Sequence, residues 1–599
     1  MRQKEKPYNW IGIVLLFVVS AFGIWKTVFL SADIDESYAV TLGIRLAHGD
    51  RLFKDMWEVH QTSAVLYAPA IFLYEKLTGG VEGLLIFLRL LGTAVSLTLS
   101  VYGYLVMRRW VNPSFACFLS ALYFNFTPKQ IQSPEFTQLL YWGIFLLGLA
   151  LLEHARTARK CFAIVTAVSL CVCVLAYPYA VWLFPVCLLI LWQPYREGGT
   201  TKWREFGVCA ALFTLVCAGL GALFILYVLS GVSVKELIGN VPYVLMDASH
   251  EQSFRQMWRM HIVSLGEMLY PTFLIMLIAQ VSMRIDKKRA GARSRFTIAA
   301  AAAAQAAAFV WQFHTIRKVN FTILLPLILQ LLCFLGYAYW ILTREDLLPE
   351  GAAKADLTEG NRTFLLAIGV PSVCATLTVL SSSNLTANYS MGFLLPALLA
   401  LCMASERTLV RICAGQRAGR EKALALSMRL LVLVFGILLL TTRVFLVRFT
   451  STQRKNVFEG YYKTTHGPLK GIRLGENDYR QYEAKTAALR EQVSEDDVFL
   501  YVGCDLFLYS QLPCRIGTGN TISTPAFGEQ LLAYYEKYPD RIPTVMFVDR
   551  GYVADFSQEL EKEPFKSFVE ARYVRDESVT DAPVSVYRLR EEPQALFVK

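Results

Sequence analysis

Long apolar blocks recur along this chain, and they constrain its fold more than any other feature. Each block runs for roughly 16–24 residues, which lets a helix cross a hydrocarbon core about 30 Å thick. In lipid the backbone N–H and C=O groups must bond within the segment, so such blocks form helices. The sequence predicts about thirteen spans, at 11–30, 82–107, 113–128, 137–153, 161–176, 180–193, 207–230, 263–283, 296–313, 319–342, 363–381, 391–404 and 424–446.

Composition agrees with a membrane protein and sets the C-terminus apart. Hydrophobic residues make up 55% of the chain and charged residues 18%, whereas ordinary globular proteins carry about 25% charged residues. Beyond residue 446 the blocks stop, and short strand and helix patterns alternate. Strands are predicted at 498–502, 544–548 and 583–589, and helices at 476–495, 526–538 and 554–571.

Strand–helix–strand order predicts a small sheet with a parallel core. The predicted fold is therefore an all-α polytopic membrane protein with a C-terminal α/β domain. Residues 1–446 form the transmembrane module, and residues 447–599 form the soluble domain.

Lys and Arg are distributed unevenly among the connections. Segments on the side of the N-terminus carry about 25 of them, and loops on the other side carry about 10. This asymmetry predicts a multi-pass protein of the cell membrane, with a cytoplasmic N-terminus and an extracytoplasmic C-terminal domain. The formal charge of +11 is then mostly a topology signal. No soluble segment carries a basic stripe interleaved with aromatics, so nucleic acid is not a predicted partner.

Two short features of the C-terminal domain are candidate functional signals, a cysteine pair and a glycine pair. Cys504 and Cys514 could form a disulfide in an oxidising compartment. Gly517-Thr518-Gly519 lacks the third glycine and the following helix of a nucleotide-binding motif. Nucleotide binding is therefore not predicted.

The first outer loop, residues 31–81, is dense in ionisable groups. Asp33 stands three residues before Glu36, the spacing of a helix N-terminal capping box, and Gly49 is a typical C-terminal stop. The loop thus predicts an amphipathic helix over 35–48 on the outer membrane surface. One interpretation of its acids is that they only cap this helix.

A second interpretation comes from a resemblance to a known family. The loop opens with D-E-x-Y at Asp35–Tyr38, continues through a helix to Gly49, and then runs LFKDMWEVHQTSAVLYAPAIFLYEKLTG, where Phe53 and Asp55 fit a G-x-x-x-Y/F-x-D element. This order resembles the first outer loop of the GT-C glycosyltransferases, in the branch of the protein O-mannosyltransferases and the lipid A aminoarabinose transferase. The sequence departs from that branch at 59–63, where V-H-Q-T-S replaces a lysine-and-proline motif, so the donor head group stays open.

The resemblance implies an inverting glycosyltransferase at the extracytoplasmic face. The donor would be a polyprenyl-phosphate-linked sugar, and the acceptor a hydroxyl of a lipid, protein or glycan. Asp35 would serve as the general base that takes the acceptor's proton, with Glu36 beside it in the catalytic pair. The leaving phosphate needs cations around it; the candidates are Arg45, Arg51, His60, Arg89, Arg317 and Lys318. Candidates for the substrate cavity are Tyr38, Asp55, Glu58, Asn384 and Asn388.

No metal is required for this chemistry, because a phosphate monoester is already a good leaving group. A divalent cation is possible, and its weak candidate ligands are Glu58, His60, His250 and Glu251; ordinary solvated side chains are the alternative. Arg89 also has a structural alternative, in which it reaches the membrane interface or pairs with an acid. Arg317 and Lys318 could equally be interfacial anchors.

The competing function is a flippase or transporter of a lipid-linked saccharide. A transporter should carry its essential ionisable residues inside the spans, near the midplane of the bilayer. Here the predicted spans are nearly free of Asp and Glu, and the acids gather in the first outer loop. The sequence therefore favours the enzyme.

Overall fold

A computed structural model gives the structure of the protein. It describes residues 10–129, 131–197, 200–246, 253–284, 290–315, 324–343, 352–382, 389–414, 419–450, 453–458, 460–503, 505–511, 514–522, 527–550, 563–579 and 582–591.

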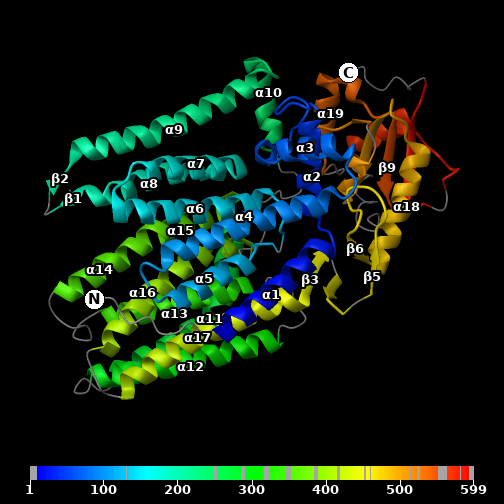
Figure 1. Ribbon diagram of the computed structural model, residues 1–599. Coiled ribbons are helices and arrows are strands. Elements are labelled where there is room, and N and C mark those ends of the chain that lie inside the picture. Colours follow the sequence, from blue (N-terminus) through cyan, green and yellow to red (C-terminus); the bar gives the residue numbers. More distant parts are fainter. Residues whose placement is uncertain are drawn as a thin grey trace.

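Helices packed side by side form a bundle, and the C-terminal domain covers one end of it (Figure 1). Within the described residues, 11 segments are long and apolar enough to cross a membrane. The helices of the bundle are α1 (Trp10–Phe29), α4 (Leu84–Met107), α5 (Pro113–Asn125), α6 (Phe136–Thr157), α7 (Cys161–Ala176), α8 (Leu183–Leu191), α9 (Trp203–Leu229), α11 (Phe254–Arg284), α12 (Ala290–Thr315), α13 (Leu324–Thr343), α14 (Ala352–Phe364), α15 (Val370–Ser382), α16 (Leu395–Ala414) and α17 (Gly419–Phe445).

These 11 segments correspond one to one with eleven of the predicted spans. The two other predicted spans, 113–128 and 161–176, are the helices α5 and α7, of 13 and 16 residues. At 1.5 Å per residue, each is shorter than the roughly 20 residues that a span needs. The structure therefore supports a multi-pass bundle without confirming a count of thirteen.

Between α1 and α4 the chain leaves the bundle and forms a compact substructure, which we call the first loop (residues 31–81). It contains α2 (Ile34–Ala47), the 3-10 helix η1 (Gln61–Leu66) and α3 (Ala68–Thr78). The sequence placed α2 on the membrane surface, and that position is wrong. Every residue from Glu36 to Arg45 is buried, because α2 is enclosed between the bundle and the C-terminal domain (Figure 1).

The C-terminal domain is built on a five-stranded sheet of order β10-β11-β9-β7-β8. The central strand β7 is parallel to β8 and β9, and β11 and β10 complete the sheet as antiparallel strands. The strands are β7 (Val498–Val502), β8 (Arg515–Ile516), β9 (Val545–Asp549), β10 (Tyr573–Arg575) and β11 (Val584–Leu589), and the helices are α18 (Glu476–Gln492), α19 (Gly528–Lys537) and α21 (Phe565–Arg572). The predicted parallel core is thus confirmed.

Both faces of β7 and β9 are buried, which explains why their sequences are continuously apolar rather than alternating. Phe499, Tyr501 and Phe547 belong to the core that α18 covers. The alternate residues Leu500 and Met546 belong to a second core formed with α19 and α21.

Short strands and one further helix attach the domain to the bundle. The strands form two hairpins, β3 (Leu446–Thr450) with β4 (Gln453–Asn456) and β5 (Tyr461–Lys463) with β6 (Arg473–Gly475). The helix α10 (Val234–Val244) leads from α9 to the side of α19 (Figure 1). Backbone bonds from Ser31 to Arg473 (2.8 Å) and from Gly83 to Gly467 (3.0 Å) fix the start of the first loop and the residue before α4 to this domain.

Candidate functional site

The N-terminus of α2 separates the roles of its neighbouring acids. Asp33 precedes the helix with an extended backbone, and its Oδ1 accepts the N–H of Asp35 at 3.0 Å. Asp33 therefore caps the helix, as predicted. Glu36 turns instead into the protein, and Asp35 is left on a different face of the first turn.

Glu36 forms a buried ion pair with Arg89 of α4. The Nε and Nη2 of Arg89 donate to the Glu36 carboxylate at 2.9 and 2.6 Å. Nη2 also donates to the carbonyl of Ser31 at 2.8 Å, and Nη1 donates to the carbonyl of Val28 at 3.0 Å. Ser133 also donates to Glu36, at 2.9 Å. A phosphate could reach Arg89 only by displacing this carboxylate. The predicted phosphate contact of Arg89 and the predicted catalytic role of Glu36 are therefore replaced by a structural ion pair.

Asp35 meets a different cation, Lys129, in the connection between α5 and α6. The Lys129 Nζ lies 2.7 Å from the Asp35 carboxylate, and 31% of the Asp35 side chain remains exposed. The Lys129 ammonium also lies 4.8 Å from the centre of the Phe136 ring. Asp35 is thus an oriented carboxylate that a second molecule can still reach.

Glu135 completes this charged group. It is buried, and its two carboxylate oxygens accept the N–H groups of Thr137 and Gln138 at 2.8 and 2.7 Å, which caps α6. Burial raises the pKa of Glu135 to about 7, although the charge of Lys129 and the Thr137 N–H oppose the shift. Burial lowers the pKa of Lys129, but the charge of Asp35, with smaller contributions from Tyr177 and Glu135, raises it above its usual value.

Aromatic rings form one wall beside these charges. Phe136 stacks on the imidazole of His60, with ring centres 3.7 Å apart, and Tyr177 lies edge-on to both rings. Tyr38 meets Phe136 edge-on at 6.3 Å. His60, a predicted phosphate ligand, is therefore part of an aromatic stack that also contains the neighbours of Asp35. Its contact with phosphate stays a prediction.

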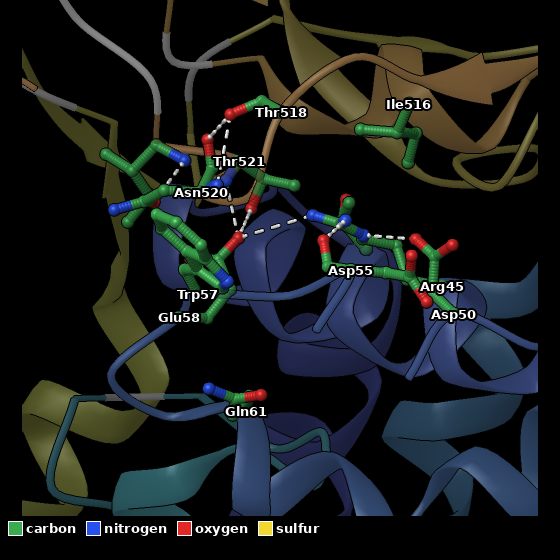
Figure 2. A network of polar contacts seen from close by, with 12 residues as sticks. Arg45, Asp50, Asp55, Trp57, Glu58, Gln61, Ile516, Thr518, Asn520 and Thr521 are labelled. Atoms are coloured by element: carbon green, nitrogen blue, oxygen red, sulfur yellow. Dashed lines mark hydrogen bonds and ion pairs between the residues drawn. The ribbon is translucent and has the colours of Figure 1, made fainter. Parts of the chain in front are cut away.

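A second polar network lies where the first loop meets the C-terminal domain (Figure 2). Arg45 is fully buried, and it binds Asp50 at 2.7 Å and the carbonyl of Asp55. The Arg45 guanidinium also lies 3.7 Å from Glu58. Arg45 thus holds the first loop in shape, and the prediction that it binds donor phosphate is not supported.

Asp55 and Arg51 also have structural partners. Arg541 of the C-terminal domain lies 2.9 Å from Asp55, whose other oxygen accepts the N–H of Arg51 at 2.9 Å. The exposed Arg51 side chain donates to the carbonyl of Gly231 at 3.2 Å. Asp55 is therefore an interface residue rather than part of a substrate cavity, and Arg51 still has an exposed guanidinium.

Glu58, another predicted cavity residue, is buried and belongs to the same interface. Its carboxylate accepts the N–H and the hydroxyl of Thr521, the latter at 2.7 Å. Burial raises the pKa of Glu58, while Arg45, Thr521 and Tyr38 lower it. Among the described residues no group of three or more His, Cys, Asp or Glu could hold a metal ion. The other suggested ligands, His250 and Glu251, lie outside the described residues.

Several further predicted positions also fall outside the described part of the chain. These are Arg317, Lys318, Asn384, Asn388 and Cys504, so the phosphate, sugar and disulfide predictions that rest on them stay predictions.

A small pocket is lined by the end of α5 and the residues that follow it. It is formed by residues 125–128, the start of α13 and the end of α17, where Arg443 contributes its side chain. The buried Asn125 Oδ1 and Thr127 Oγ1 have no hydrogen-bond partner within the described structure. Two such atoms beside a guanidinium could accommodate a polar group.

Four residues of the site were not predicted from the sequence: Lys129, Glu135, Tyr177 and Thr521. Only a weak signal marked the first two: the short connection between two apolar blocks contains one Lys and one Glu. Nothing in the sequence indicated that either would meet Asp35, which lies 94 residues before Lys129.

The raised pKa of Glu135 predicts a pH dependence of stability. Its folded pKa is about 7 and its usual value 4.5, so between these values the folded protein holds a proton that the unfolded chain releases. The free energy of unfolding therefore falls as pH rises from about 4.5 to 7, by about 3 kcal/mol from this group. Glu135→Gln stays neutral and should gain stability over the wild type across this window. Thermal unfolding of both proteins in detergent at pH 4.5 and 7.5 measures the difference; parallel pH curves would contradict the assignment.

Fold and site together define a polytopic membrane protein that carries an oriented carboxylate, a lysine and an aromatic stack, with an α/β domain at one end of its bundle. No family model matches the chain, and no curated protein sequence matches it. Among solved structures it is similar to two of ArnT from Cupriavidus metallidurans. The one bound to undecaprenyl phosphate is 12% identical with a TM-score of 0.44, covering 97% of this chain and 98% of that chain. The apo structure is 14% identical with a TM-score of 0.40, covering 96% and 98%.

Proposed function

We propose that the protein is a glycosyltransferase that moves a sugar from a polyprenyl-phosphate carrier to an acceptor hydroxyl at the extracytoplasmic face. The observation that carries the proposal is the Asp35–Lys129 pair. It sets a reachable carboxylate beside an ammonium group, at the end of a membrane bundle where a lipid head group would lie. The resemblance of the first loop to that of the GT-C glycosyltransferases supports the same reaction.

Asp35 suits the role of general base. The acceptor hydroxyl gives its proton to the Asp35 carboxylate as its oxygen bonds to the anomeric carbon of the sugar. The bond from that carbon to the phosphate oxygen breaks, and its electron pair leaves with the lipid phosphate. Attack from the side opposite the phosphate inverts the anomeric carbon. Asp35 afterwards releases its proton to water.

Lys129 suits the role of phosphate partner, in place of the predicted Arg45 and Arg89. Negative charge grows on the phosphate as it leaves, and a positioned ammonium stabilises that charge. A phosphate that takes Lys129 away from Asp35 would at the same time free the carboxylate to accept a proton. Donor binding would therefore make the Asp35 carboxylate available as the general base.

A transporter of a lipid-linked saccharide is the competing function. It requires ionisable residues near the middle of the spans, whereas the charged groups Asp35, Lys129 and Glu135 all lie at helix ends or in connections. This placement favours a reaction at the membrane surface over passage through the bundle.

The two functions are distinguished by following the carrier lipid. Undecaprenyl phosphate linked to a panel of hexoses and pentoses is supplied to purified protein together with membranes that contain the acceptor. A transferase should release undecaprenyl phosphate and move the sugar to a new product. A transporter should leave the sugar on its carrier, and this result would refute the proposal.

Substituting Lys129 should act chiefly on the donor. Lys129→Met removes a charge-assisted bond to phosphate, which contributes about 1.5–3 kcal/mol, so the donor KM should rise roughly 10- to 100-fold. Lys129→Arg should keep part of the affinity. The exposed Lys76→Met on α3 is the matched control. A Lys129→Met enzyme with a normal donor KM would remove Lys129 from the phosphate site.

A further inference from the structure

A loop of the C-terminal domain is built into the wall of the first loop. The carbonyl of Gly519 accepts the N–H of Trp57 at 2.6 Å, and Thr521 donates twice to Glu58 (Figure 2). Thr518 holds this segment in its bend, because its hydroxyl donates to the Asn520 carbonyl at 2.6 Å and accepts the Asn520 N–H at 3.0 Å. The segment 517–521 therefore presents Thr521 to Glu58 in a fixed geometry.

Glu58 is a buried carboxylate for which the proposed reaction has no use. Only 1% of its surface is exposed, and a buried charge must be met by donors or a counter-charge. The Arg45 guanidinium lies 3.7 Å away and already binds Asp50. The N–H and the hydroxyl of Thr521 both donate directly to the Glu58 carboxylate.

Glu58 is linked to α2, the helix that carries the proposed base, because the Arg45 guanidinium of that helix lies 3.7 Å from the Glu58 carboxylate. Tyr38 lies close enough to Glu58 for its charge to raise the pKa of the Tyr38 phenol, after burial itself. Tyr38 stands one helical turn after Asp35 on α2, and residues three apart lie on the same helix face. The Tyr38 ring meets Phe136, over which the Lys129 ammonium lies.

We infer that Thr521 is a positioning residue: through Glu58 and Tyr38 it holds the first turn of α2, and hence Asp35, in the geometry needed for transfer. The C-terminal domain therefore completes the site rather than only covering it. The catalytic consequence of this inference rests on the proposed function. The contact between Thr521 and Glu58 is independent of that function.

Substituting Thr521 should change the pH dependence of kcat, because charged and titratable groups surround Glu58. The groups that face Glu58 are Arg45 and Tyr38 of α2, Thr521, and the phenols of Tyr67 and Tyr509, which respond to its charge. Burial raises the pKa of Glu58, and the Thr521 hydroxyl opposes this. Removing the hydroxyl should raise that pKa further, so Glu58 becomes neutral at a higher pH.

The test compares Thr521→Val with Thr521→Ser. Valine keeps the shape and the backbone N–H but lacks the hydroxyl, whereas serine keeps the hydroxyl. Release of undecaprenyl phosphate should show a kcat about tenfold lower for Thr521→Val, because small misplacements of reacting groups are costly. The donor KM should be unchanged, and the acidic limb of the pH–kcat profile should move to higher pH. Thr521→Ser should restore both, and the exposed Thr465→Val is the control.

Two results would overturn the inference. One is a normal kcat and pH profile in Thr521→Val, and the other is a lower kcat with an unshifted profile, which a general loss of packing would produce. Asp35→Asn is assayed in parallel, since normal turnover in that variant would refute the proposed base whatever Thr521→Val does. Hydrogen exchange needs no substrate: it should quicken at residues 36–40 as well as 517–522 in Thr521→Val. Faster exchange at residues 517–522 alone would show that Thr521 does not hold α2 in place.

Discussion

Asp35→Asn should fold, insert and bind the donor, yet transfer sugar about 10²–10⁴ times more slowly, the usual loss for a missing general base. Asparagine keeps the size of the side chain and one oxygen, but it cannot accept the acceptor's proton. Lys129 loses its counter-charge at 2.7 Å, although it keeps the face of Phe136. The measurement is single-turnover release of undecaprenyl phosphate beside equilibrium binding of the same lipid.

Asp33→Asn is the matched control two residues away. Asparagine caps helices as well as aspartate does, so the bond to the Asp35 N–H survives, and the variant should stay largely active. A dead but folded Asp33→Asn beside an active Asp35→Asn would reverse the two assignments. Normal turnover in both variants would remove the first loop from the chemistry.

Arg89→Met should destabilise the protein by about 3–5 kcal/mol, the usual cost of leaving one partner of a buried ion pair without its counter-charge. Glu36 would keep the Ser133 hydroxyl at 2.9 Å but lose both guanidinium bonds. The carbonyls of Val28 and Ser31 would lose their donors as well. The loss is measured by thermal unfolding in detergent, with the fraction of monodisperse protein as the readout.

The double variant Glu36→Met/Arg89→Met separates structure from donor binding. Apolar side chains of similar volume can replace a buried ion pair at little cost, so most of the lost stability should return. Undecaprenyl phosphate should bind the folded double variant with the same affinity as it binds the wild type. Binding lost in a fully folded double variant would instead return Arg89 to the phosphate site.

The sequence predicted local structure correctly where that structure depends only on neighbouring residues. The cap at Asp33 and the boundaries of β7 follow from residues next to one another, because capping and strand formation use neighbouring backbone groups. The position of α2 could not be predicted in the same way. Its apolar residues are equally suited to a membrane surface and to a protein interior, and the C-terminal domain that buries it is encoded more than four hundred residues later.

The sequence by itself determined which stretches are apolar and long enough to cross a membrane and that the C-terminus folds as an α/β domain, because both depend on hydrophobicity and period along one stretch of chain. It also supplied the ionisable groups of the first loop. Only the tertiary structure decided their partners: Arg89 takes Glu36, and Lys129 takes Asp35. Thr521 reaches Glu58 across 463 residues of chain. A charge in a sequence is compatible with any opposite charge, and only the packing of the folded chain decides which of them come within bonding distance.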